Sequence, residues 1–401
     1  MSTNYSRVVS GMRPTGNLHL GHYHGVLKNW VKLQQDHECF FFIADWHALT
    51  TEYADTKKIS SSINNTVIDW LASGVDHEKA TIFIQSHVPE HAELNTLLSM
   101  ITPLSWLERV PTYKGQQEKL NKKDLSTYGF LGYPLLQSAD ILIYNADLVP
   151  VGEDQVAHIE LTREIARHFN YLYGREADFE EKAQQAAQKM GKKNAKLYHK
   201  LKLEYQEKGS KEALIEARKL ITSQGNINSQ DQNRLISFLE GGGKTILLEP
   251  QPLLTKTSKM PGLDGQKMSK SYNNTISLKD DISSVADKIR KMPTDPARIR
   301  RNDAGNPQLC PVWQYHEIYS TQETKDKIQD GCTSASIGCL DCKKIIIEPV
   351  CLELEQIQNK AQKYTKDPEL IKHILDIGAK AAREQAQKTM DEVRAAMGLK
   401  Y

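Results

Sequence analysis

The chain has 401 residues, of which 39% are hydrophobic and 25% charged, so it can bury a core in two or three domains. Its net charge of +2 gives no general sign of a nucleic-acid-binding protein, and such a surface has to come from local patches. The first twelve residues are polar, and the longest apolar run, residues 39–44, is too short to cross a membrane, which predicts a cytoplasmic protein without a membrane segment.

Strand-like and helix-like segments alternate over the first 170 residues. Short apolar stretches suited to buried strands lie at residues 7–11, 39–44, 80–84 and 147–151. Segments with helical spacing of apolar residues separate them, at residues 20–35, 59–73, 134–143 and 159–169. This alternation predicts an α/β fold with a doubly wound, Rossmann-like parallel sheet in residues 1–173.

The rest of the chain divides by composition into three parts. Residues 174–247 lose the strand pattern, carry a lysine-rich stretch and are expected to form a helical insertion. Those lysines are interpreted either as the solvated face of a helical hairpin or as a contact for nucleic-acid phosphates. Residues 248–280 are expected to return to the sheet domain. Residues 281–401 are expected to form a helical domain whose last helix can pack back on the sheet.

A histidine-containing segment follows the first predicted strand. Arg13-Pro-Thr-Gly-Asn-Leu-His-Leu-Gly-His22 opens the first predicted helix, and a helix N-terminus presents unpaired N–H groups to a phosphate. His19 and His22 lie three residues apart, so both imidazoles can face one phosphoryl group. Neutral imidazoles could donate hydrogen bonds to the charge that develops there. The expected nucleotide contacts in this segment are Arg13, Pro14, Thr15, Gly21 and His22.

A basic loop lies far downstream, within a glycine-rich stretch. Lys267-Met-Ser-Lys-Ser271 places two lysines around a small turn, where they can clamp a triphosphate. Cations aimed at the pyrophosphate stabilise charge as the α–β bond breaks. The expected nucleotide contacts in this stretch are Lys259, Met260, Lys267, Met268, Ser269, Lys270 and Ser271.

Together these two segments resemble the HIGH and KMSKS signatures of class I aminoacyl-tRNA synthetases. Residues 42–50, 133–144 and 149–163 resemble the tryptophanyl-tRNA synthetase family, and the sister tyrosyl family is the alternative. The resemblance covers residues 5–170 and 255–400 and leaves residues 175–247 outside. It implies a homodimer that uses ATP and Mg²⁺ to activate tryptophan and transfers it to the 3′ end of tRNA(Trp). A synthetase-like regulator that binds tRNA or nucleotide without aminoacylation is the other alternative.

The resemblance also implies roles for individual residues. An indole N–H only donates, so a carboxylate is a suitable acceptor, and Asp140 matches the family's indole-reading aspartate. The family pattern places His19 and His22 at the α-phosphate and Lys267 and Lys270 at the pyrophosphate. Gln137 stands where many members have methionine. The further matched positions are Tyr133 and Gln155 at the substrate amino group, His47 in the tryptophan pocket, and Gly152, Glu153 and Asp154 at the ribose.

Four cysteines near the C-terminal part have the spacing C-x21-C-x6-C-x2-C; they are Cys310, Cys332, Cys339 and Cys342. Four thiolates suit a [4Fe–4S] cluster or a tetrahedral zinc ion. A subset of bacterial tryptophanyl enzymes carries a [4Fe–4S] cluster on a similar spacing, which favours iron–sulfur over zinc or free thiols. The resemblance makes residues 281–401 an anticodon-binding domain, in which Lys343 and Lys344 are expected to meet the tRNA.

Overall fold

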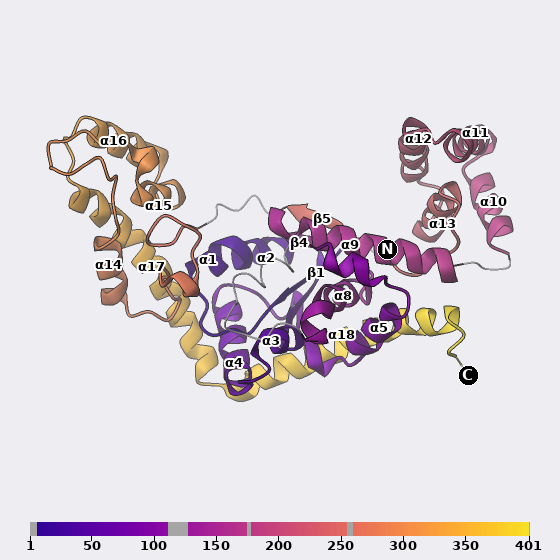
Figure 1. Ribbon diagram of the computed structural model, residues 1–401, viewed down its shortest axis with the longest axis horizontal. Helices are drawn as coiled ribbons and strands as arrows, with labels where there is room; N and C mark the ends of the chain where they lie inside the picture. The colour runs from indigo at the N-terminus through magenta and orange to yellow at the C-terminus, as the bar shows by residue number, and fades with distance from the viewer. Residues whose placement is uncertain (1–5, 111–126, 175–177, 255–259, 401) are drawn as a thin grey trace. The chain divides into compact units, whose positions relative to one another are not determined.

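The computed structural model describes residues 6–110, 127–174, 178–254 and 260–400 (Figure 1). Five strands form one sheet in the order β3-β2-β1-β4-β5. Their bounds are Arg7–Met12 (β1), Glu38–Ile43 (β2), Ala80–Ile84 (β3), Leu148–Val151 (β4) and Gln251–Leu254 (β5). β2 pairs in parallel with β1 and with β3, in registers that start at Arg7↔Glu38 and Cys39↔Ala80. The predicted α/β fold with a parallel sheet is confirmed.

The helices of the N-terminal half follow the predicted alternation, with additions. The predicted helix at residues 20–35 is a helical run whose middle is a π-helical segment, η1. Its parts are Leu20–His22 (α1), Tyr23–Leu27 (η1) and Lys28–Leu33 (α2). The other helices of this half are Asp45–Glu52 (α3), Lys57–Ala72 (α4), Glu90–Ser99 (α5), Leu104–Glu108 (α6), Tyr128–Leu142 (α8) and Val156–Tyr173 (α9). Helices α3, α5 and α6 were not predicted.

Aromatic side chains build the core around β2, whose residues after Glu38 are all buried. Trp30 of α2 stacks on Phe41 with ring centroids 4.2 Å apart, and Trp70 of α4 meets Trp30 edge-on at 4.9 Å. Because side chains alternate along a strand, Phe42 points to the opposite face of the sheet. Buried aromatic rings of this size account for a large share of the stabilising apolar area.

Two compact units make up the chain. One consists of Met1–His87 with Leu253–Ala381, and the other of Val88–Pro252 with Ala382–Tyr401. The C-terminal helices are Ile282–Arg290 (α14), Pro311–Tyr319 (α15), Gln322–Thr333 (α16), Cys339–Thr365 (α17) and Pro368–Ala396 (α18). Within the first unit α18 lies directly on β3, since a Cβ added at Gly378 would be 1.8 Å from the Ile82 carbonyl oxygen. Among the described residues no helix is long and apolar enough to span a membrane.

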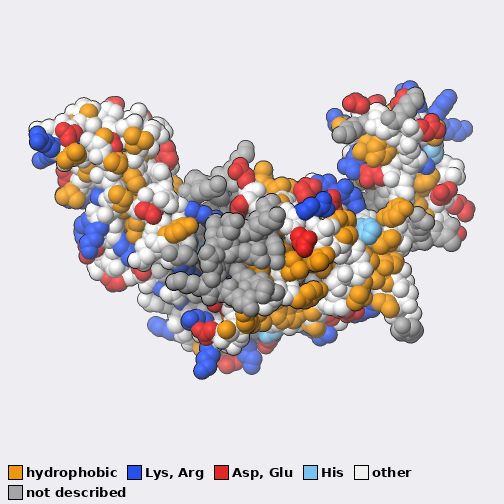
Figure 2. All heavy atoms as spheres, in the orientation of Figure 1, with side chains coloured by type: hydrophobic (Ala, Val, Ile, Leu, Met, Phe, Trp, Pro, Cys, Tyr) orange, Lys and Arg blue, Asp and Glu red, His pale blue; other side chains and the backbone are white. Residues whose placement is uncertain are grey.

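The residues of the predicted insertion form four helices with a hydrophobic core of their own. These are Phe179–Lys189 (α10), Lys192–Lys208 (α11), Lys211–Thr222 (α12) and Ser229–Leu239 (α13). Tyr198 is the largest side chain of this core, is fully buried and donates from its hydroxyl to the Leu235 carbonyl at 2.7 Å. Lysine and arginine side chains gather on the outer surface of α11 and α12 (Figure 2).

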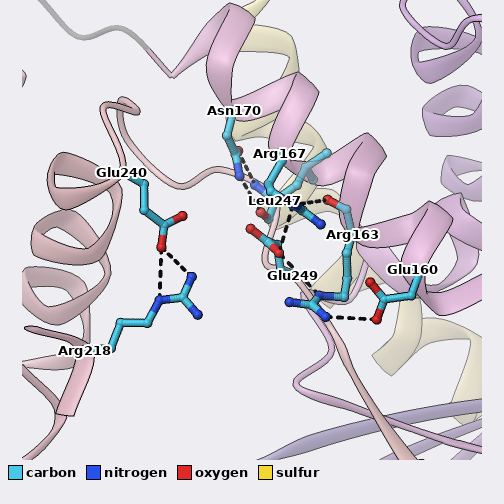
Figure 3. A network of polar contacts seen from close by, with 8 residues as sticks. All are labelled: Glu160, Arg163, Arg167, Asn170, Arg218, Glu240, Leu247 and Glu249. Carbon is cyan, nitrogen blue, oxygen red and sulfur yellow. Dashed lines mark hydrogen bonds and ion pairs between the residues drawn. The ribbon is translucent and has the colours of Figure 1, made fainter. Parts of the chain in front are cut away.

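A polar network fixes the returning chain to α9 (Figure 3). Asn170 donates to the Leu247 carbonyl at 2.7 Å and accepts from the Ile246 and Leu247 amides. Arg163 and Arg167 both pair with Glu249, at 3.4 and 3.2 Å. The chain thus enters and leaves the four-helix segment at one place, next to a single helix.

Candidate active site

The histidine turn, residues 13–22, is joined by its backbone to the chain that follows the lysine loop, residues 267–271. The Leu278 amide donates to the Leu18 carbonyl at 2.9 Å, and His19 forms an antiparallel bridge with Ser277. The two segments singled out from the sequence are therefore neighbours within one compact unit.

The two histidine rings lie next to each other, with centroids 3.8 Å apart. Burial lowers the pKa of His22 to about 3, helped by His19 and Lys270, and burial with the charge of Lys270 lowers the pKa of His19 to about 4. Both rings are thus neutral at pH 7. His22 accepts the His19 amide on Nδ1 at 3.2 Å, which leaves its proton on Nε2. Each ring can donate one hydrogen bond to a phosphate oxygen, as expected for neutral imidazoles.

Glycine is required beside these rings. A Cβ at Gly21 would lie 2.8 Å from Nδ1 of His19, so any larger residue would displace the ring. Gly16 has φ +85°, and a Cβ there would lie 3.5 Å from Nζ of Lys270. The sequence predicts that a nucleotide lies on the backbone at Gly21. In the structure Gly21 also leaves space for the ring of His19.

The lysine loop contacts the histidine turn through two side chains. Nζ of Lys270 donates to the Thr15 carbonyl at 2.7 Å. Met268 is buried, and its sulfur accepts from the Gly21 amide at 3.3 Å. Lys267 is exposed. One lysine of the loop is thus held next to the two histidines.

Asn274 organises the lysine loop and was not anticipated from the sequence. It is 3% exposed, accepts the Ser269 amide on Oδ1 at 2.8 Å and donates through Nδ2 to the Lys267 carbonyl at 3.1 Å. It also donates to Asp264 at 2.8 Å. One asparagine among polar loop residues has no sequence signal that marks it as the residue holding the loop.

Asp69 of α4 is a second unanticipated residue of this site. It is 2% exposed, and its Oδ2 has no hydrogen-bond partner among the described residues. Burial raises the pKa of Asp69 to about 6, although Lys279, a backbone hydrogen bond from Leu18 and Lys270 each lower it. When ionised, Asp69 is a buried counter-charge for Lys270. An aspartate within the apolar stretch of a predicted helix was the signal that could have identified it.

The remaining predicted nucleotide contacts lie around these groups. Arg13 donates to the Thr51 hydroxyl at 2.7 Å, which directs its guanidinium to α3. Pro14 and Met260 are buried and Thr15 is exposed. Ser271 belongs to a short 3-10 helix, Lys270–Tyr272. Lys259 lies outside the described residues.

The residues predicted to bind the amino acid come mainly from α8, in the other compact unit. Tyr133, Gln137 and Asp140 follow one another at helical spacing and share one side of α8. Asp140 is 1% exposed and accepts a 2.6 Å hydrogen bond from Nδ1 of His91. The Tyr133 ring lies 5.6 Å from that of His158. A buried carboxylate on this helix fits the role of an acceptor for a ring N–H.

The other predicted substrate contacts are placed separately. Gly152, Glu153 and Asp154 are exposed at the start of a short 3-10 helix, Glu153–Gln155, directly after β4. Gln155 donates to Asp154 at 3.3 Å. His47 lies on α3, in the unit that carries the histidine turn.

The four cysteines begin or end helices of the C-terminal part. Cys310 precedes α15, Cys332 lies near the end of α16, and Cys339 and Cys342 occupy the first turn of α17. Burial, helped by the other three thiols, raises the pKa of Cys342 to about 12, so the four sulfurs share one neighbourhood. In the part of the chain that the structure describes, no group of three or more His, Cys, Asp or Glu side chains is arranged to hold a metal ion.

One expectation for this region is wrong. Lys343 is 5% exposed and donates to the carbonyls of Arg290 and Met292 at 2.8 and 2.6 Å, so it cannot meet a tRNA. Its ammonium group satisfies carbonyl oxygens near the end of α14 instead. Lys344 is exposed and pairs with Asp341 at 3.0 Å.

Comparisons with known proteins identify the family of the chain. The family model for class I tRNA synthetases (W and Y) matches residues 1–218 and 218–350. The tryptophan–tRNA ligase of Ralstonia nicotianae is 61% identical over 395 residues, which cover 98% of this chain and 99% of that protein. The ligase of Thermotoga maritima is 45% identical over 98% of this chain and 100% of its own.

A solved structure gives the same result. The tryptophanyl-tRNA synthetase of Campylobacter jejuni, in complex with ADP and tryptophan, matches with a TM-score of 0.72 at 26% identity, over 98% of this chain and 100% of its own. Because the Ralstonia match covers nearly the whole chain, it includes residues 175–247, which the sequence reading wrongly left outside the resemblance. This chain belongs to the class I tRNA synthetases of the tryptophan and tyrosine family.

Proposed function

We propose that the chain is a tryptophan–tRNA ligase, which activates tryptophan with ATP and transfers it to the 3′ end of tRNA(Trp) in protein synthesis. This proposal depends on one observation: Lys270 lies next to the neutral imidazoles of His19 and His22. It supports adenylation, and the 61% identity to a tryptophan–tRNA ligase supports the choice of amino acid.

In the first step the tryptophan carboxylate attacks the α-phosphate of ATP, and pyrophosphate leaves. His19 and His22 donate to oxygens of the α-phosphate, where neutral donors stabilise growing negative charge without needing to lose a proton. Lys267 and Lys270 stabilise the leaving pyrophosphate. Mg²⁺, when bound, neutralises charge on the phosphates. Adenosine would be held by Gly21 and Met268, with Gly152, Glu153 and Asp154 at the ribose.

In the second step the adenylate passes its acyl group to the terminal adenosine of the tRNA. The protein contributes mainly by holding both reactants in place. Asp140 accepts the indole N–H, while Tyr133 and Gln155 hold the substrate amino group. Gln137 and His47 are the further proposed contacts to tryptophan. Residues 281–401 would meet the anticodon, in a homodimer that acts in the cytoplasm.

Pyrophosphate exchange tests the substrate assignment. The chain should catalyse exchange of labelled pyrophosphate into ATP with tryptophan and far less with tyrosine, because its relatives of 61% and 45% identity are tryptophan–tRNA ligases. Greater exchange with tyrosine would make it a tyrosyl enzyme. Exchange with neither amino acid, and no charging of tRNA, would favour the regulator that does not aminoacylate.

We further propose that Cys310, Cys332, Cys339 and Cys342 hold a [4Fe–4S] cluster, with zinc as the alternative. The effect of the other three thiols on the pKa of Cys342 supports a common site. A positive ion would favour the thiolate forms that burial disfavours. Protein purified without oxygen should contain iron and acid-labile sulfide, and Cys342→Ser should lose both. One zinc ion per chain would replace the cluster assignment with a zinc site. Protein that contains neither iron nor zinc would refute the metal site.

A further inference from the structure

His91 of α5 lies between two buried side chains, Tyr144 and Asp140, of which Asp140 belongs to the predicted tryptophan site. Its side chain is completely buried, with Nδ1 2.6 Å from Oδ1 of Asp140 and Nε2 2.7 Å from the hydroxyl of Tyr144. Asp140 and Tyr144 are themselves 1% and 0% exposed. All three residues belong to one compact unit, and none was singled out from the sequence except Asp140.

The chemistry of the three groups gives the hydrogen bonds a direction. An ionised aspartate only accepts, so Nδ1 of His91 has to carry the proton of the short bond. Burial raises the pKa of Tyr144 well above its usual value, helped by Asp140 and Glu90, so its hydroxyl keeps its proton and can donate to Nε2. The hydrogen bonds then run from the Tyr144 hydroxyl to His91 and from His91 to Asp140. The second bond orients the plane of the Asp140 carboxylate.

The helix that carries His91 is itself held in place. Glu90 is 4% exposed and accepts from Arg383 at 2.7 Å, and Glu93 forms a two-bond pair with Arg394 at 2.7 and 2.6 Å. Both arginines come from the C-terminal half of α18, within the same unit. A side chain on such a supported helix can keep a neighbouring carboxylate within the narrow range of positions that recognition needs.

We propose that His91 is the positioning residue for substrate selection: it holds Asp140 in the orientation that accepts a ring N–H. This inference rests on the proposed function, in which Asp140 reads the indole nitrogen. A donor on Nδ1 also compensates the burial of the carboxylate, which without a partner would be costly and would tend to reorient. Discrimination by a buried polar group is strong only when that group is held in place.

The test compares tryptophan with β-(3-benzothienyl)alanine, an isostere that has sulfur in place of the indole N–H. His91→Asn keeps a donor about where Nδ1 lies, whereas His91→Gln keeps one about where Nε2 lies. We expect His91→Gln to reduce the ratio of kcat/KM for tryptophan to kcat/KM for the analogue by about tenfold. This is about the contribution of one hydrogen bond to a charged group. His91→Asn should keep most of the preference, and KM for ATP should change little in both variants.

The outcomes separate a positioning role from a structural one. Equal losses for both amino acids in His91→Gln, or the same preference in both variants, would overturn the proposal. The two variants are both polar, and a general loss of folding would lower kcat for both amino acids without changing the preference between them. If the unaltered enzyme does not exchange pyrophosphate with tryptophan at all, the proposed function fails before any variant is compared.

Discussion

Replacing Lys270 with alanine is expected to slow adenylate formation by about 10²- to 10³-fold, the usual effect of removing a group aimed at developing charge. Nζ of Lys270 reaches the Thr15 carbonyl at 2.7 Å, next to both histidines. ATP in the ground state already has other contacts, so its affinity should fall much less than the rate. Single-turnover adenylate formation and equilibrium binding of ATP, measured on the same sample, give the two quantities.

The pKa values of the two histidines give a second test of Lys270→Ala. Burial lowers the pKa values of His19 and His22 most, and the charge of Lys270 lowers them further. Both pKa values should therefore rise in Lys270→Ala, which NMR titration of the ring protons can measure. Lys327→Ala is the matched control, because Lys327 is an exposed lysine paired with Glu323 on the surface of α16. Equal losses in rate and ATP affinity would contradict the proposed role of Lys270 at the pyrophosphate.

The regular elements of the fold were readable because their burial leaves a periodic pattern. The run at residues 39–44 predicted a strand buried on both faces, and β2 is that strand. Residues 281–401 were expected to end in a helix, and α18 is that helix. The π-helical segment η1 was not readable, because spacing of apolar residues cannot distinguish one wider turn within a helical run.

The sequence predicted those parts of the candidate site whose residues form short motifs in a fixed order. The histidine turn and the lysine loop each carry their residues within a few positions of one another. Asn274, Asp69 and His91 act through partners that are distant in sequence or in an irregular loop, so their roles exist only after folding. Lys343 is the opposite case: its place in a basic pair predicts a surface group, but it is buried against carbonyl oxygens.

A half-buried carboxylate, Glu353 of α17, joins that helix to the segment that follows His22. It accepts from His24 at 3.0 Å, from Lys28 at 2.8 Å and from Tyr319 at 2.7 Å. Burial by itself raises the pKa of Glu353, but the hydrogen bonds and charge of His24, with bonds from Lys28 and Tyr319, outweigh it and lower the pKa to about 2.

Glu353→Gln is expected to reduce the free energy of unfolding at pH 7 by about 3 kcal/mol, the linkage value of a pKa lowered by roughly two units. Because the folded-state pKa is below the unfolded value, this stability is present above about pH 4.5 and is lost as the pH falls towards 2. Urea unfolding of both proteins between pH 7 and pH 3 should therefore show a difference that narrows with acid.

The matched control for Glu353 is Glu323→Gln, since Glu323 is an exposed carboxylate paired with Lys327. Its replacement should change the free energy of unfolding by less than about 1 kcal/mol. A difference that stays constant with pH would show that glutamine disturbs packing and that the charge of Glu353 contributes nothing. Since His24 follows His22 by two positions, loosening its contact with Glu353 should also shift the histidine rings. Adenylate formation by Glu353→Gln should then slow at temperatures where the protein is still folded, which links the stability of α17 to the chemistry at the histidine turn.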